Sequence, residues 1–109
     1  MSQRFLSALF ILAASGAPTF AAELHVAIEN IKFSPDILEV HKGDTVIWKN
    51  NDVVPHTVTA EADSPKQKPA FASKQLLPGH EFKWKAKKLA EINYKCLLHP
   101  AMKAKLTVK

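Results

Sequence analysis

Apolar and polar residues alternate with a period of two along most of the chain after residue 22. In the segment 24–28, Leu24, Val26 and Ile28 take one side, and His25 and Ala27 take the other. Alternation over four to eight residues is typical of a half-buried β-strand. The other segments that we predict as strands are 37–40, 45–49, 56–59, 81–87, 91–96 and 105–109.

Turn-forming residues separate these strands, at 41–44, where Gly43 supplies a permissive backbone, and at 50–52 and 77–79. The polar segment 61–75 contains two prolines, and we expect a surface excursion with room for one helical turn. No internal repeat and no pattern for a long helix occurs. Short strands separated by turns predict an all-β fold of seven to eight strands, an antiparallel sandwich or barrel.

The first 21 residues differ from the rest. Arg4 precedes the apolar run 5–17, and Thr19 and Ala21 occupy the −3 and −1 positions of a cleavage site. This is the pattern of a secretory signal peptide, which predicts cleavage after Ala21 and export to the periplasm. The alternative is an uncleaved N-terminal anchor, although the apolar run is short for a membrane span.

The length of 109 residues suits one domain, which we place at residues 22–109. The hydrophobic fraction of 47% excludes a disordered chain. After loss of Arg4, 14 basic and 10 acidic residues give a net charge of +4. The lysines at 83, 85, 87 and 88 form either a solvated face that resists edge pairing or a surface that steers an acidic partner. The basic run matches no nucleic-acid module, so we expect no nucleic acid as a partner.

Cys96 is the only cysteine of the chain, so it cannot form an internal disulfide. A free thiol in an oxidising compartment needs an explanation. Cys96 is in phase with Ile92 and Tyr94, so its sulfur is predicted to point to the core at the end of a strand. A buried structural cysteine and a metal ligand both remain open from this observation alone.

Cys96, His99 and Met102 follow one another at steps of three in the stretch KCLLHPAMK. This spacing is also that of one stripe of an amphipathic helix, but Pro100 disfavours a helix here. The stretch also lies between two strand patterns. We therefore predict a tight loop in which the three side chains converge.

Thiolate, thioether and imidazole donors together favour copper over calcium or magnesium. Two histidines, one cysteine and a distant axial methionine form the blue-copper arrangement, so one more histidine is needed. His56 follows Pro55 and opens a strand that could pair with 92–96, which makes it the best candidate. The remaining histidines of the mature chain are expected at the surface: His25, His41 and His80.

The segments NNDVVPHTVT and YKCLLHPAMKAKLTV, supported by KGDTVIWKNND and LLPGHEFKW, resemble segments of one known family. Over essentially its whole mature length, the chain thus resembles the blue copper proteins, or cupredoxins. The Cys-x₂-His-x₂-Met spacing is similar to the short ligand loop of amicyanin-like and plastocyanin-like members. The resemblance implies a Greek-key β-sandwich that binds one type 1 copper ion. It implies His56, Cys96 and His99 as trigonal ligands and Met102 as the axial ligand.

Four positions depart from the family pattern. Thr57 stands where an asparagine commonly ties the ligand loops together, and a threonine reaches less far. Leu98 replaces a proline, and Ala90 and Ala104 lie where glycine is usual. None of these changes removes a ligand, but they bear on the rigidity of the loop and so on its reduction potential.

The resemblance implies a carrier that cycles between Cu(I) and Cu(II). Four protein ligands leave no open position for a substrate, so we expect no enzyme. We expect a periplasmic monomer without stable membrane insertion, which exchanges single electrons near His99. Its expected partners are transient redox proteins, a cytochrome c or a copper or quinoprotein enzyme, with an acidic docking face. The alternatives are a copper carrier or copper-resistance protein, and a metal-free adhesion-like sandwich.

Overall fold

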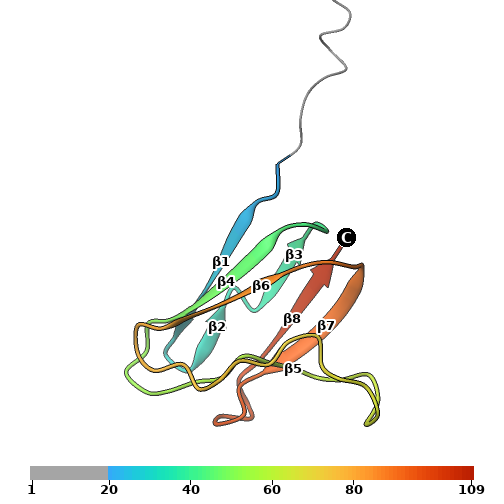
Figure 1. Ribbon diagram of the computed structural model, residues 1–109. Coiled ribbons are helices and arrows are strands. Elements are labelled where there is room, and N and C mark those ends of the chain that lie inside the picture. The colour runs from blue at the N-terminus through green and yellow to red at the C-terminus, as the bar shows by residue number, and fades with distance from the viewer. Residues whose placement is uncertain (1–19) are drawn as a thin grey trace, which may run out of the picture.

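The computed structural model describes residues 20–109, so the predicted signal peptide lies outside the described residues except for its last two positions. The described chain folds into eight strands and contains no helix (Figure 1). It therefore has, within residues 20–109, no helix that is long and apolar enough to cross a membrane. The strands are β1 (Glu23–Glu29), β2 (Lys32–Ser34), β3 (Ile37–Val40), β4 (Thr45–Asn50), β5 (Thr59–Ala60), β6 (Glu81–Lys85), β7 (Ala90–Lys95) and β8 (Lys103–Val108).

The strands form two four-stranded sheets, in the orders β2-β1-β4-β6 and β3-β8-β7-β5. This confirms the predicted all-β sandwich. Both sheets are mixed, because β1 runs parallel to β4 and β3 runs parallel to β8, while the other pairs are antiparallel. A period of two reports which face of a strand is buried, and it is the same for either strand direction. The alternation therefore could not distinguish a mixed sheet from the purely antiparallel one expected.

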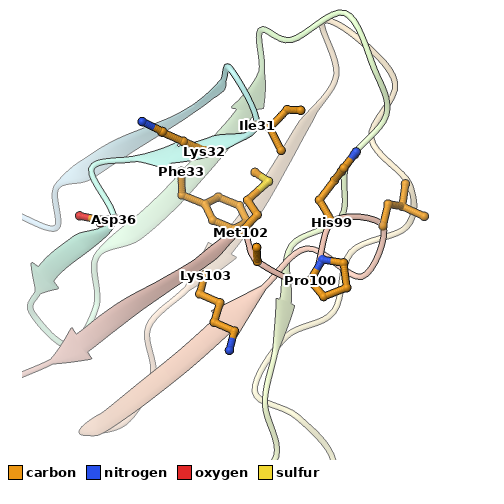
Figure 2. Close-up of a pocket in the computed structure, with 10 residues that line it drawn as sticks. Ile31, Lys32, Phe33, Asp36, His99, Pro100, Met102 and Lys103 are labelled. Atoms are coloured by element: carbon orange, nitrogen blue, oxygen red, sulfur yellow. The ribbon is translucent and has the colours of Figure 1, made fainter.

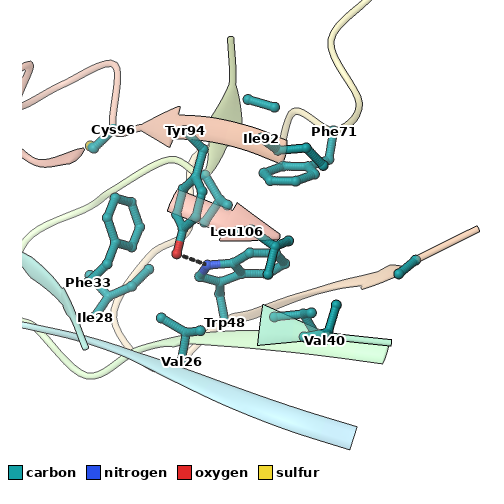
Figure 3. Close-up of a cluster of buried hydrophobic side chains, with 14 of the residues drawn as sticks. Val26, Ile28, Phe33, Val40, Trp48, Phe71, Ile92, Tyr94, Cys96 and Leu106 are labelled. Atoms are coloured by element: carbon teal, nitrogen blue, oxygen red, sulfur yellow. Dashed lines mark hydrogen bonds between the residues drawn. The ribbon is translucent and has the colours of Figure 1, made fainter. Parts of the chain in front are cut away.

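The core lies between the two sheets, and Trp48 of β4 is at its centre (Figure 3). The Trp48 indole and the Tyr94 ring of β7 meet edge to face at 5.6 Å, and both side chains are almost fully buried. Trp48 Nε1 donates a hydrogen bond of 3.2 Å to the Tyr94 hydroxyl. The two sheets are thus joined by packing and by one buried hydrogen bond that satisfies both polar groups.

Two glycines form the predicted turns at 41–44 and 77–79. Gly43 and Gly79 have φ values of 101° and 88°, in the region that L side chains rarely adopt. The Gly79 amide donates to the carbonyl of Asn50 at 2.6 Å, where β4 ends. The turn before β6 is therefore fastened to the end of β4.

The segment 61–75 connects the sheets as an excursion of bends and turns without a helical turn. It is anchored by Phe71, which is 5% exposed and packs against Trp48 and Trp84 at ring distances of 5.2 and 5.0 Å. The Ala60 amide donates to the Phe71 carbonyl at 2.9 Å. The polar composition predicted the surface position of the segment, but the single aromatic anchor was not recognised from it.

Candidate metal centre

Two connections meet at one end of the sandwich, the one after β4 and the one between β7 and β8 (Figure 1). The first carries His56 and the second carries Cys96, His99 and Met102. Short pairing of β5 with β7 places Thr59 beside Lys95 and so holds the connections together. This confirms that the strand after His56 lies next to the strand that ends at Cys96, although forty residues separate the two side chains.

Cys96 is fully buried, and Tyr94 and Ile92, two and four residues before it, are buried as well. The intervening residues, Asn93 and Lys95, are exposed or half-buried. The period of two along β7 therefore continues to the cysteine. The predicted inward direction of its sulfur is confirmed.

The structure brings His56, Cys96 and His99 together, and their potential ligand atoms all lie within 4.8 Å of one another. Cys96 Sγ is 3.6 Å from His56 Nδ1 and 3.8 Å from His99 Nδ1. The imidazole centroids are 4.8 Å apart. Both histidines thus direct the same ring nitrogen toward the sulfur.

These separations suit a first-row metal ion placed between the three atoms. In metal sites of this kind a thiolate lies about 2.3 Å and an imidazole nitrogen about 2.0–2.1 Å from the ion. At angles between tetrahedral and trigonal, those bond lengths put sulfur and nitrogen about 3.6–3.8 Å apart. The donor set is soft to borderline, which favours copper, and the residues present therefore fit that ion.

Asp52 orients His56 from the side away from the cysteine. Asp52 Oδ2 lies 2.8 Å from His56 Nε2, and the imidazole itself is fully buried. The hydrogen bonds from His56 and from the Ile31 amide hold the pKa of the Asp52 carboxyl below its ordinary value. An ionised carboxylate only accepts, so Nε2 carries the hydrogen, and in the neutral ring the lone pair of Nδ1 faces Cys96.

Asn50, fully buried at the end of β4, braces the connection that carries His56. Its amide nitrogen donates to the carbonyls of Val54 and Leu76, both at 2.9 Å. Its side-chain oxygen accepts from the amide of Asp52 at 2.9 Å. The residue that holds His56 is therefore itself held by a buried and satisfied polar group.

Thr57 joins the two connections directly. Its hydroxyl oxygen accepts from the Leu97 amide at 2.9 Å, and its own amide donates to Cys96 Sγ at 3.3 Å. Although a threonine side chain is shorter than an asparagine side chain, Thr57 therefore still joins the two connections. The close approach of the two backbones lets the shorter side chain bridge them.

The stretch from Cys96 to Met102 is a tight loop without helix, as predicted. The Cys96 amide donates to the Met102 carbonyl at 3.1 Å, and the Met102 amide donates to the His99 carbonyl at 2.8 Å. Met102 is 4% exposed. It lines a hollow of about 650 Å³ together with Ile31, Phe33, His99 and Pro100 (Figure 2).

Asp52 and Asn50 were not recognised from the sequence. Both lie in a cluster of polar residues that the sequence identifies only as a turn. The available signal for Asp52 was its position four residues before His56. The other three histidines, His25, His41 and His80, are exposed as predicted and lie outside this cluster.

Residues 20–109 match the model of a family described as copper binding proteins, plastocyanin/azurin family. A curated relative is amicyanin from Paracoccus versutus, which is 26% identical over 119 aligned positions. The alignment covers 94% of this chain and 89% of amicyanin.

Solved structures show the same fold. A purple cupredoxin from Nitrosopumilus maritimus is 29% identical with a TM-score of 0.71, and the match covers 79% of this chain and 99% of that chain. A copper-containing nitrite reductase from Thermus scotoductus is 27% identical with a TM-score of 0.72, over 86% of this chain but only 24% of the reductase. The likeness to the reductase is therefore to one part of a longer protein.

Proposed function

This chain belongs to the plastocyanin/azurin family of copper-binding proteins, the cupredoxins, and we propose that it is a periplasmic carrier of single electrons between redox partners. The family binds one copper ion, and the His-Cys-His cluster needed for it is present. Copper in such a site supplies a one-electron couple between Cu(I) and Cu(II).

We propose His56, Cys96 and His99 as the trigonal ligands and Met102 as the axial ligand. The first three side chains converge within 4.8 Å, and Met102 is tied to Cys96 and His99 through backbone hydrogen bonds. Asp52 accepts a hydrogen bond from His56 and orients its ring, and Thr57 accepts one from the Leu97 amide and so fixes the two loops against each other. Because the donors are held by the protein in either oxidation state, little rearrangement accompanies electron transfer.

The burial of the donors argues against catalysis. His56 and Cys96 are fully buried, and Met102 is 4% exposed. A catalytic metal site keeps a position open for substrate, whereas four protein donors fill the coordination of this ion. Electron carriage without substrate chemistry is therefore the function that the site supports best.

His99 is the one proposed ligand that reaches the surface, since its side chain is only half-buried. Exposed Leu97 and Leu98 adjoin it, with exposed fractions of 57% and 43%. An apolar surface of this kind suits the small and transient interfaces of redox proteins. We propose that a cytochrome c, or a copper or quinoprotein enzyme, docks here against a monomer of this chain.

The observation that carries the proposal is the convergence of two Nδ1 atoms on Cys96 Sγ at 3.6 and 3.8 Å. Stopped-flow mixing with a cytochrome c measures electron transfer, and mixing with a Cu(I) chelator measures copper release. An electron carrier exchanges electrons rapidly and retains its copper. Rapid release of Cu(I) together with slow electron exchange would favour the copper carrier instead.

A pair of variants tests the docking surface. Leu98→Lys places a charge in the apolar surface beside His99 and should slow electron transfer to the cytochrome by about tenfold, the effect of losing about 1.4 kcal/mol of complex stability. Leu89→Lys makes the same change at a residue that is 67% exposed before β7, at the other end of that strand. Equal slowing by both variants would show that electrons do not pass through the His99 surface.

A further inference from the structure

A second hollow, of about 660 Å³, lies beside β6 and is separate from the metal centre. Its rim carries Lys68, Lys83, Lys85, Lys87 and Lys88. Trp84, which is half-buried, contributes an apolar part of its wall. We call this feature the lysine groove.

No carboxylate lines the lysine groove. Its five lysines also form no ion pair with any described residue. The acidic Glu61, Asp63 and Glu91 line an adjoining hollow, which shares Lys68 and Lys88 with the groove, and Glu91 is paired with Lys105 at 2.8 Å. Lys83, Lys85 and Lys87 line only the side of the groove away from these carboxylates. The groove therefore concentrates positive charge that the protein itself leaves unpaired.

The groove runs along an open strand edge. β6 is the last strand of its sheet and pairs only with β4, so its other edge has no strand beside it. The exposed Lys83 and Lys85 alternate with half-buried Trp84 along this edge. Pairing with the same edge of a second copy would bring lysine against lysine, which is unfavourable, whereas an acidic strand would be attracted.

We propose that the lysine groove docks an extended acidic segment of a partner protein. The segment would add to the free edge of β6 through backbone hydrogen bonds, as in β-strand addition. Its carboxylates would pair with the lysines of the rim, and an apolar side chain would contact Trp84. Charge complementarity selects this occupant, and the fit does not depend on whether copper is bound.

The lysine groove lies toward the end of the sandwich opposite the metal centre. β7 begins at Ala90, which lines the groove, and runs to Cys96. Ile92 also lines the groove, so Cys96 lies four to six residues further along the strand direction, or about 13–20 Å at about 3.3 Å per residue. A partner bound in the groove therefore leaves the surface around His99 free for a second protein.

The test uses a ten-residue peptide of alternating glutamate and threonine, added to copper-free and copper-loaded protein. Amide chemical shifts in NMR spectra locate the bound peptide. We expect shifts at residues 68–70 and 83–92 in both forms, with residues 97–102 unchanged. Shifts centred on 97–102, or no binding at low salt, would overturn the proposal.

Charge-reversal variants then test the rim. Lys83→Glu with Lys85→Glu should weaken peptide binding at least about tenfold, since close like charges repel. Lys32→Glu with Lys103→Glu is the matched control, because it changes the net charge equally at two exposed lysines near the metal centre. Equal loss of peptide binding in both variants would show that only the overall charge matters, and it would contradict binding in the lysine groove.

A third arm separates the acidic segment from other anions. Vesicles containing phosphatidylglycerol and a single-stranded oligonucleotide are titrated under the same conditions. The proposal expects the acidic peptide to bind more tightly than either. Preferential binding of the vesicles or of the oligonucleotide would overturn it.

Should the variant with both Lys83→Glu and Lys85→Glu fail to fold, Lys83→Gln with Lys85→Gln gives the same comparison of peptide binding.

Discussion

Asp52 and Thr57 determine how the proposed ligands face one another, although neither is itself a proposed ligand. Asp52 accepts from His56 Nε2 at 2.8 Å and so directs Nδ1 toward Cys96. Thr57 accepts from the Leu97 amide and donates its own amide to Cys96 Sγ. Residues that hydrogen-bond to metal ligands commonly affect the metal affinity of a site as well as the orientation of its ligands.

Replacing Asp52 by alanine should weaken copper affinity about 10- to 100-fold, because the buried His56 loses the group that orients it. Competition titration with a chelator measures the change. Asp52→Asn, which keeps an acceptor oxygen, should recover part of the affinity. Asp63→Ala, an exposed carboxylate outside the site, serves as the control, and an equal loss there would contradict the role of Asp52.

Thr57→Val keeps the shape of the side chain but removes the acceptor for the Leu97 amide. We expect a loss of about 1–3 kcal/mol in the free energy of unfolding, the cost of an unsatisfied polar group. Urea unfolding of the copper-free protein measures it. Thr57→Ser retains the hydroxyl and should lose clearly less, so similar losses in both variants would argue against the hydrogen bond.

The sequence predicted the proposed ligands better than the residues that support them. A lone cysteine, its spacing to His99 and Met102, and the position of His56 after Pro55 all have strong residue-type signals. Asp52 and Asn50 have none, because acidic and amide residues are also the ordinary components of turns. Their roles depend on the path of the backbone in three dimensions.

Among the elements, β7 links the core to the metal centre. It carries Tyr94 into the aromatic core, where the ring contacts Phe33 edge to face at 4.8 Å. Cys96 follows two residues after Tyr94, at the start of the loop that comes after β7. Burial raises the pKa of Tyr94 to about 12, partly offset by the hydrogen bond from Trp48.

Tyr94→Phe preserves the ring but leaves the buried Trp48 Nε1 without its acceptor. We expect the free energy of unfolding to fall by about 1–3 kcal/mol at neutral pH, measured by urea unfolding. Val108→Ala serves as the comparison variant, because it truncates a buried side chain elsewhere in the core without removing a hydrogen bond. An unchanged stability of Tyr94→Phe would show that the Trp48 hydrogen bond has no net value.

Tyr94 is also expected to make the stability of the folded state depend on pH in the alkaline range. The pKa of Tyr94 is higher in the folded state than its ordinary value of 10, so the folded state favours the neutral phenol. Its contribution to stability is complete below about pH 10 and is lost as pH rises toward 12. Stability curves between pH 9 and 12 should fall more steeply for the wild type than for Tyr94→Phe, and parallel curves would contradict this account.

Strand periodicity predicted the position of nearly every element, but not how the elements pair. The inward residues of β1 and β7 were identified because alternation reports burial, whereas β4 buries three consecutive residues and does not alternate. The parallel pairing of β1 with β4 was missed, because it joins strands that are distant in sequence. The bounds of β5 also differ, since His56 belongs to an isolated bridge with Leu76 and the strand begins at Thr59.

At the scale of the whole molecule, removal of the predicted signal peptide would make Ala22 the first residue. The Ala22 amide nitrogen donates to Asp44 Oδ1 at 3.0 Å, and the Ala22 carbonyl accepts from Thr45 at 2.9 Å. The amides of Ala22 and His41 hold the pKa of the Asp44 carboxyl below its ordinary value. Cleavage after Ala21 would turn this hydrogen bond into an ion pair with the new α-ammonium group.

A protein that begins at Ala22 should therefore unfold at a higher temperature than one that retains Ala21. The pKa of Asp44 is depressed in the folded state, so the gain is present above its ordinary value near 3.8 and is lost as pH falls through the folded pKa. Thermal melts at pH 7 and pH 3 measure this gain. A difference that persists unchanged in Asp44→Asn would contradict the ion pair.

The visible spectrum of the copper(II)-loaded protein tests the central claim most directly, that His56, Cys96 and His99 ligate one copper ion. Thiolate ligation in this trigonal arrangement is expected to give an intense sulfur-to-copper charge-transfer band. The account predicts a strongly coloured wild type whose band disappears in Cys96→Ser. A colourless wild type, or a band that survives in Cys96→Ser, would contradict it.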